Sequence, residues 1–170
     1  MANTLYLLIG GNQGDRIALL HKATDLIQTR IGSVAHLSPV YETAPWGLFA
    51  PGETPQNFLN LALEVLTPLP PIEALHEALA IEKDLGRQRP YGTTGPFYSS
   101  RPIDIDLILY DDLVIDTPEL VLPHPRMHLR QFVLKPLCDI APDYIHPIFN
   151  KTIRQLLEQC PDTSSCACYA

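Results

Sequence analysis

The sequence predicts an α+β fold with a mostly antiparallel sheet. Apolar segments with the two-residue alternation of strands outnumber those with helical spacing, and short connections join several of them. Antiparallel strands can be joined by short connections, whereas neighbouring parallel strands need a long crossover. The length of 170 residues and the hydrophobic content of 46% fit a single globular domain with a sizeable buried core.

The amino-terminal third predicts two strands that flank a helix. Leu5–Ile9 is a continuous apolar run that ends at a glycine pair, as in a buried strand followed by a tight turn. Asp15 can cap the next segment, whose apolar residues recur with helical spacing as far as Gly32. Val34–Thr43 alternates loosely and predicts the second strand. The segment 44–56 is rich in glycine and proline and too long for a simple connection, which indicates a binding loop or lid.

A further strand is predicted over Asn57–Leu66, because its residues divide between two faces. Aliphatic residues share one face, and Phe58 and Asn60 share the other. An aromatic ring beside an amide could stack on and hydrogen-bond a flat heterocycle. The alternative is a core phenylalanine next to a strand-end asparagine, and the pattern taken alone favours that alternative.

The next helix is predicted from a proline pair at 70–71 to Leu85, with a glycine as its stop. Glu82 falls on the apolar side of this helix, where a carboxylate is costly without a partner. Arg87 and Arg89 are the obvious partners. They begin a second glycine-rich loop, which we expect to act as a lid over 88–100 and to bring arginines to the start of the following strand.

Arg101–Tyr110 carries the clearest functional signal in the chain. Its alternation places Asp104 and Asp106 on one face of a strand, roughly 6–7 Å apart. At an effective dielectric of about 20 their repulsion is about 2.5 kcal/mol, which a hard cation would relieve. Arg101 adds a guanidinium suited to phosphate. The alternative is a solvated strand face without a function. Aspartate is disfavoured in strands, however, and the strand continues with apolar residues. Both observations favour a central strand whose polar end opens into a phosphate-handling site.

Charge and composition narrow the class of ligand. The net charge of −7 argues against a nucleic-acid partner, yet five of the eight arginines lie between residues 87 and 130, which suggests a small anionic ligand. No apolar run approaches the roughly 20 residues that a membrane span needs, and the first residues do not resemble a signal peptide. We therefore expect a cytoplasmic protein with no membrane partner.

The rest of the chain predicts smaller elements. A short strand near Leu113–Ile115 precedes a proline-bounded loop and the apolar segment Phe132–Leu137, and a terminal helix is expected around Ile153–Glu158. We expect residues 1–160 to form one domain and residues 161–170 to form a flexible tail. The four cysteines lack the spacing of a zinc site, so incidental reduced thiols are the simpler interpretation.

Three common types of site find little support. The chain has no Gly-Lys dipeptide and so no P-loop, and its early glycines lack the G-x-G-x-x-G spacing of dinucleotide-binding folds. His124 and His128 could face alike on a helix as zinc ligands. The prolines at 123 and 125 would break that helix, and no third ligand is evident.

Several separated motifs occur in a fixed order along the chain. They are LIGGN near the start, Y-x-T-x-P-x-G at Tyr41–Gly47, FLN at Phe58–Asn60, IE-x-x-x-GR-x-R at Ile81–Arg89, RPIDIDLILY at Arg101–Tyr110 and LPHPRMHLRQFVLKPL at Leu122–Leu137. Each motif is weak alone, but the ordered set resembles the 6-hydroxymethyl-7,8-dihydropterin pyrophosphokinase family of folate biosynthesis. The resemblance runs from Leu5 to about Leu157.

The resemblance implies a ferredoxin-like fold and transfer of diphosphate from Mg-ATP to the hydroxymethyl group of the reduced pterin, with release of AMP. It implies two Mg²⁺ ions held by Asp104 and Asp106. The pterin pocket that it implies consists of Thr43, Ala44, Trp46, Phe58, Asn60 and Phe132. The ATP-side residues that it implies are Glu82, Arg87, Arg89, Arg101, Leu107, His124 and Arg130, and the arginines at 87, 89 and 101 act with the two aspartates in catalysis.

The alternative from another class is a ferredoxin-like module that binds a pterin without catalysis. Such a module explains the face that carries Phe58 and Asn60 but gives the aspartate pair and the arginines no role. Binding of ATP that depends on Mg²⁺ discriminates between the two. We expect a monomer whose partners are ATP and a reduced pterin.

Overall fold

The computed structural model describes residues 2–44, 55–86 and 102–169. Within these residues the main sheet contains β1 (Asn3–Gly11), β2 (Ser33–Leu37), β3 (Tyr41–Thr43), β4 (Phe58–Thr67), β5 (Asp104–Tyr110) and β8 (Cys166–Cys168). The strand order is β5-β1-β4-β3-β8, and β2 also pairs with β4. Every one of these pairs is antiparallel, as the sequence predicted.

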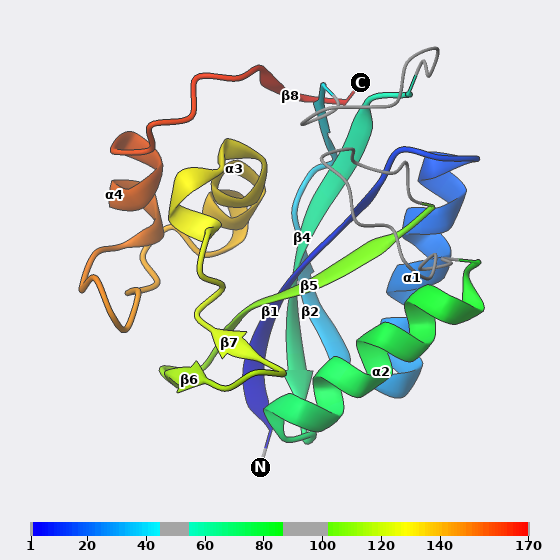
Figure 1. Ribbon diagram of the computed structural model, residues 1–170, viewed down its shortest axis with the longest axis horizontal. Coiled ribbons are helices and arrows are strands. Elements are labelled where there is room, and N and C mark those ends of the chain that lie inside the picture. The colour runs from blue at the N-terminus through cyan, green and yellow to red at the C-terminus, as the bar shows by residue number, and fades with distance from the viewer. Residues whose placement is uncertain (1, 45–54, 87–101, 170) are drawn as a thin grey trace.

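Helices cover both faces of the sheet (Figure 1). Helices α1 (Arg16–Arg30) and α2 (Pro71–Asp84) pack on one face, whereas α3 (Gln131–Ile140), with α4 (Ile153–Glu158) beside it, packs on the other. With β2 and β3 counted as one interrupted strand, since both pair with β4, the order β1-α1-β2/β3-β4-α2-β5 is the βαββαβ pattern of ferredoxin-like folds, so the expected fold is confirmed. A small hairpin of β6 (Ile115–Asp116) and β7 (Val121–Leu122) and a 3-10 turn, η1 (Met127–Leu129), precede α3.

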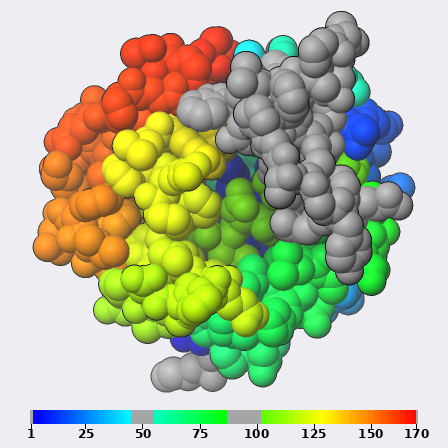
Figure 2. Space-filling view, viewed as in Figure 1, coloured from blue at the N-terminus to red at the C-terminus, as the bar shows by residue number. Residues whose placement is uncertain are grey.

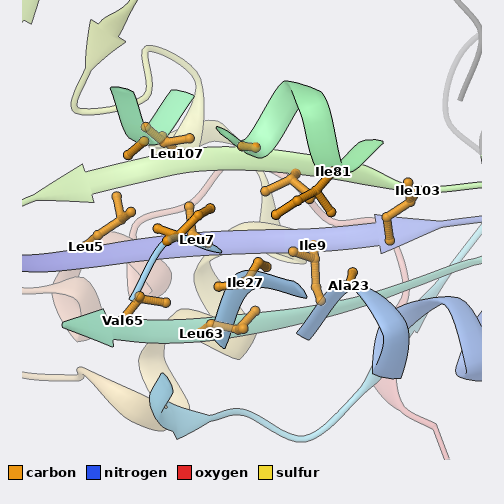
Figure 3. Close-up of a cluster of buried hydrophobic side chains, with 14 of the residues drawn as sticks. Leu5, Leu7, Ile9, Ala23, Ile27, Leu63, Val65, Ile81, Ile103 and Leu107 are labelled. Carbon is orange, nitrogen blue, oxygen red and sulfur yellow. The ribbon is translucent and has the colours of Figure 1, made fainter. Parts of the chain in front are cut away.

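The larger hydrophobic core lies between the sheet and helices α1 and α2. Alternate residues of β1, Leu5, Leu7 and Ile9, point into it and are fully buried, as Figure 3 shows. Ile27 of α1 and Ile81 of α2 meet them from the helices. Each such side chain stabilises the fold by about 1.5–3 kcal/mol relative to an exposed one. Asp15 caps α1 as predicted, because its carboxylate accepts the Ala18 amide at 3.1 Å.

The second core lies on the opposite face of the sheet, beneath α3. Tyr6 and Leu8 of β1 contribute to it together with Val133, Leu134 and Leu137 of α3. The apolar segment identified in the sequence is therefore the buried side of a helix. Because β1 supplies both cores from alternate residues, it is a central strand, and its ends fix where the neighbouring strands present their side chains.

The structure departs from the predicted strands at three points. The segment that we expected to form a central strand is β5, which lies at one end of the described strand order with β1 as its neighbour. The pairing of β1 with β5 shifts register, so that Leu109 joins the second core while Tyr110 joins the first, the reverse of strict alternation. The single strand expected over Val34–Thr43 is two strands, because regular pairing with β4 is interrupted at residues 38–40, although β2 and β3 run in the same direction along β4. The side-chain oxygen of Ser38 accepts the Ala62 amide of β4 at 2.8 Å and so replaces a regular pairing there.

The carboxyl-terminal residues differ from the flexible tail that we expected. Residues 166–168 form β8, which extends the sheet beyond β3 with Cys166 opposite Thr43. The amide of Tyr169 also donates to the Val40 carbonyl at 2.8 Å. The tail uses backbone groups that the edge of β3 leaves open, a partner that no local pattern in the tail reveals. Among the described helices, none is long and apolar enough to span a bilayer.

Candidate functional site

A pocket opens where β1, β3, β4 and β5 approach the start of α3. Its lining residues are Leu8, Gly10, Thr43, Ala44, Phe58, Asn60, Asp104, Asp106, Arg130 and Phe132. In Figure 2 the floor of this hollow is formed by β1 and β5, beside the segment that leads into α3. Eight of these ten residues were predicted as ligand-binding residues, seven of them for the pterin or the metal and Arg130 for ATP. One pocket therefore joins the predicted acidic pair to the predicted aromatic and amide groups.

The acidic side of the pocket comes from β5. Asp104 lies opposite Gly10 and Asp106 lies opposite Leu8 in the pairing with β1. Both aspartates are half-buried and line the pocket, whereas Ile105 between them is buried in the first core. The predicted orientation of the pair is thus correct. The alternative of a fully solvated strand face does not fit their place in the pocket wall.

Glu82 secures β5 at the level of this acidic pair. Its carboxylate accepts the Ile105 amide at 2.7 Å, and the Glu82 side chain is buried. The amide that it binds belongs to the residue between the two aspartates, so Glu82 fixes the backbone from which both project. The predicted partners Arg87 and Arg89 lie outside the described residues.

We predict that Glu82→Ala lowers the free energy of unfolding by about 1–3 kcal/mol, because it leaves the Ile105 amide without that acceptor. Glu82→Gln keeps an acceptor oxygen and should recover most of the loss. Urea denaturation of both variants checks this, with Glu73→Ala on the exposed side of the same helix as the control. Equal stability of the Ala and Gln variants would contradict this role.

The opposite side of the pocket combines polar and aromatic groups. The side-chain amide of Asn60 donates to the Thr43 hydroxyl at 3.2 Å, and both residues are buried. Phe58 reaches the pocket from the start of β4, and Phe132 reaches it from the first turn of α3. The Arg130 guanidinium lies 5.4 Å from the centre of the Phe132 ring. Such a set can hold a flat, polar heterocycle between apolar rings.

Gly10 and Leu8 were not identified from the sequence as pocket residues. A Cβ atom at Gly10 would lie 2.3 Å from the Asn60 side-chain oxygen and 2.8 Å from the Leu59 carbonyl oxygen. Glycine is therefore required for the Asn60 side chain to lie across β1. These two residues could be identified only through the strand pairing. The strand next to β5 must place two alternate residues opposite the two aspartates, and on β1 these are Gly10 and Leu8.

We predict that Gly10→Ala displaces the Asn60 side chain and weakens binding of the heterocycle while costing about 1–3 kcal/mol of stability. Calorimetric titration and urea denaturation measure the two effects. Part of the stability loss should disappear in an Asn60→Ala background, where the clash with the side chain is removed. Additive losses in the double variant would contradict a direct clash.

His124 is neutral near pH 7. Burial lowers its pKa to about 4, and the nearby Arg130 guanidinium acts in the same direction. Its Nδ1 atom accepts the Arg126 amide at 3.2 Å, so the proton of the neutral ring lies on Nε2. His124 is therefore a hydrogen-bond donor beside Asp104 and Arg130 rather than a cation.

The structure leaves some predicted site residues untested. Trp46, Arg87, Arg89 and Arg101 lie outside the described residues, as does most of both predicted lids. Leu107 lies on the other face of β5 with its side chain in the first core, so only its backbone could meet a ligand. These assignments remain predictions.

The chemistry of the pocket suits a hard cation. In the part of the chain that the structure describes, no group of three or more histidine, cysteine, aspartate or glutamate side chains could enclose a metal. Mg²⁺ commonly binds through one or two carboxylates together with phosphate oxygens of a substrate. Asp104 and Asp106 provide such a pair on one wall of the pocket, so these residues fit the expected ion.

Comparison with known proteins agrees with this geometry. A sequence model of the 7,8-dihydro-6-hydroxymethylpterin-pyrophosphokinase family matches residues 6–142. The 2-amino-4-hydroxy-6-hydroxymethyldihydropteridine pyrophosphokinase of Porphyromonas gingivalis is 44% identical over 144 residues, covering 84% of this chain and 93% of that protein. The Bacillus subtilis protein of the same name is 40% identical over 142 residues, covering 83% of this chain and 80% of its own.

The fold is also similar to that of solved structures. An HPPK-DHPS protein of Plasmodium falciparum, crystallised with pterin and p-hydroxybenzoate, superposes with a TM-score of 0.74 at 19% identity. The match covers 94% of this chain but only 43% of that longer protein, and it bears on the fold alone. The family match and the two bacterial relatives are sequence similarities over most of the chain, and they identify its family as well as its fold. Together they show that this chain belongs to the 7,8-dihydro-6-hydroxymethylpterin-pyrophosphokinase family.

Proposed function

We propose that this protein transfers diphosphate from ATP to the hydroxymethyl group of 6-hydroxymethyl-7,8-dihydropterin, with release of AMP, as a step in folate biosynthesis. The observation that carries the proposal is the single pocket in which an aspartate pair faces Phe58, Asn60 and Phe132. A pterin bound against these groups would have its substituent close to the aspartates. Family membership and the names of the bacterial relatives support the same reaction.

In this reaction the hydroxymethyl oxygen of the pterin attacks the β-phosphorus of ATP. The bond from that phosphorus to the bridging oxygen on the α-phosphate breaks, AMP leaves with this oxygen, and the hydroxyl proton passes to solvent. Such substitution needs in-line positioning and stabilisation of spreading negative charge rather than covalent help from the protein. The pocket supplies positioning through its two walls and charge stabilisation through the residues described next.

Asp104 and Asp106 would hold two Mg²⁺ ions against the phosphates of ATP. When bound, such ions neutralise phosphate charge and lower the pKa of the attacking hydroxyl. Arg130 lines the same pocket and adds a positive charge, and His124 offers its Nε2 proton to a ligand oxygen. Arg87, Arg89 and Arg101 are proposed to stabilise the transferred and leaving phosphate oxygens, with the two loops as lids that exclude water.

On the pterin side, Phe58 and Phe132 are proposed to sandwich the ring system while Asn60 and Thr43 hydrogen-bond its edge. Ala44 and Trp46 are proposed to contribute mainly through their backbones. Glu82 acts on the site by fixing β5. We further propose that the chain works as a cytoplasmic monomer, with residues 1–160 as the catalytic domain.

An AMP-release assay with ATP, Mg²⁺ and 6-hydroxymethyl-7,8-dihydropterin tests this function. We expect one AMP for each pterin diphosphate formed, with no ADP. A protein that binds the pterin but shows no Mg²⁺-dependent ATP binding and releases no AMP would be the non-catalytic binding module instead. Release of ADP would indicate transfer of a single phosphoryl group and would contradict the proposal.

A further inference from the structure

Residues 160–169, here termed the C-terminal strap, contact two elements that line the pocket, α3 and β3. The strap leaves α4, passes α3 and ends beside β3 at the edge of the sheet (Figure 1). It lies entirely beyond residues 6–142, which the family model matches. Nothing in the proposed reaction so far gives it a role.

The strap completes the amino-terminal end of α3. The backbone amide of Gln131, the first residue of the helix, donates to the Asp162 carboxylate at 3.1 Å, and the Gln131 side chain donates to the Asp162 carbonyl at 2.6 Å. The residue at the N-cap position of α3, Arg130, makes no side-chain capping bond of its own. The missing cap is therefore supplied from 31 residues further along the chain.

This cap acts directly beside the pocket, because Gln131 stands between Arg130 and Phe132, which both line it. Asp162 is itself held in place by Ser164, whose amide donates to the carboxylate at 2.9 Å. The direction of the Phe132 ring depends on where α3 begins. A contact that fixes the first helical residue therefore fixes the ring as well.

The other end of the strap holds β3. Cys166 and Cys168 pair opposite Thr43 and Tyr41, and the Lys135 ammonium of α3 donates to the Cys166 carbonyl at 2.7 Å. Thr43 is the hydroxyl partner of Asn60 in the pocket. The strap thus joins α3 to β3 by bonds at both of its ends.

We propose that the C-terminal strap positions the pterin pocket, with Asp162 setting the place of Phe132 and β8 setting the place of Thr43. The inference rests on the proposed function for the identity of the ligand. The strap does not touch the aspartate pair through any described contact and reaches the ATP side only through Arg130, the residue before Gln131, so its loss should affect the pterin more than ATP. Asp162 is a positioning residue, not a catalytic one.

The test compares full-length variants. Asp162→Ala should weaken pterin binding by up to about fivefold to tenfold, the fold-change equivalent to the roughly 1 kcal/mol of stability that a helix cap contributes, and change ATP binding less than twofold. Asp162→Asn keeps an acceptor oxygen and should restore affinity to within about twofold of the wild type. Thr163→Ala, at an exposed neighbouring position, is the matched control and should behave as the wild type.

The β3 end is tested in the same way. Proline at 167 cannot donate a backbone hydrogen bond within β8, so Ala167→Pro should weaken pterin binding, whereas Ala167→Thr should not. Unchanged pterin affinity in both Asp162→Ala and Ala167→Pro, or an equal loss of pterin and ATP affinity, would overturn the inference.

Hydrogen exchange separates this inference from the proposed function. In the ligand-free protein, Asp162→Ala should increase amide exchange at residues 131–133, and Ala167→Pro should increase it at residues 41–43. If the wild type released no AMP, the proposed function would be wrong, but the exchange rates would still test whether the strap positions α3 and β3. Wild-type exchange rates in both variants would overturn the positioning role whatever the reaction proves to be.

Discussion

Asp106→Asn is expected to lower the rate of AMP release by at least about 10²–10³-fold while the protein stays folded, and Asp104→Asn should do the same. The substitution keeps the size of the side chain but removes a charge that a phosphate-bound cation requires. Both side chains line the pocket rather than the core, so their loss should leave stability nearly unchanged. Steady-state AMP release and urea denaturation measure the two quantities.

The matched control for this prediction is Asp112→Asn, an exposed aspartate in the turn that follows the same strand. It changes the net charge equally but lies away from the pocket, so its activity should equal that of the wild type. Pterin affinity should fall much less than activity in the Asp104 and Asp106 variants. A variant at either position that kept a tenth of the wild-type rate would contradict the role of the pair.

Phe58→Ala is expected to weaken pterin binding by about 1–3 kcal/mol, the range for a base stacked on an aromatic side chain. Phe58 lines the pocket and is only partly buried, so the effect should come from lost contact with the ligand rather than from a weakened core. ATP binding without pterin should be unchanged. Isothermal titration with each ligand separately gives both affinities.

Two further variants control the stacking prediction. Phe58→Tyr keeps the ring and should retain most of the affinity, and Phe149→Ala removes an exposed aromatic residue outside the pocket and should have no effect on binding. If the ATP defect of Phe58→Ala exceeded its pterin defect, Phe58 would serve the core rather than the pocket.

The sequence predicted the acidic wall because strand alternation is a local property. Asp104 and Asp106 are two residues apart on a strand with an apolar opposite face, so their common direction needed no knowledge of the fold. The same reasoning found the face of Phe58 and Asn60, although it could not decide between core and pocket. That decision came from the neighbouring strand, since Thr43 on β3 completes the polar group.

The sequence did not predict features that depend on distant partners. The register shift opposite Leu109 and Tyr110 arises from pairing with β1 and leaves no mark in the β5 sequence. The sequence showed Gly10 as part of a turn signal, but the position requires glycine because the Asn60 side chain lies across it. The cap that Asp162 gives to Gln131 joins residues 31 positions apart. Such contacts follow from tertiary packing rather than from local pattern.

The central claim is that the pterin and the phosphates of ATP occupy one pocket, and paramagnetic relaxation tests it most directly. Mn²⁺ takes the same oxygen ligands as Mg²⁺ and broadens the NMR signals of nearby protons. In a complex with Mn²⁺, a non-hydrolysable ATP analogue and the pterin, we predict strong broadening of the pterin hydroxymethyl protons, which Asp106→Asn abolishes. Sharp signals from the pterin hydroxymethyl protons in the saturated wild-type complex would place the metal and the pterin in separate sites and contradict the account.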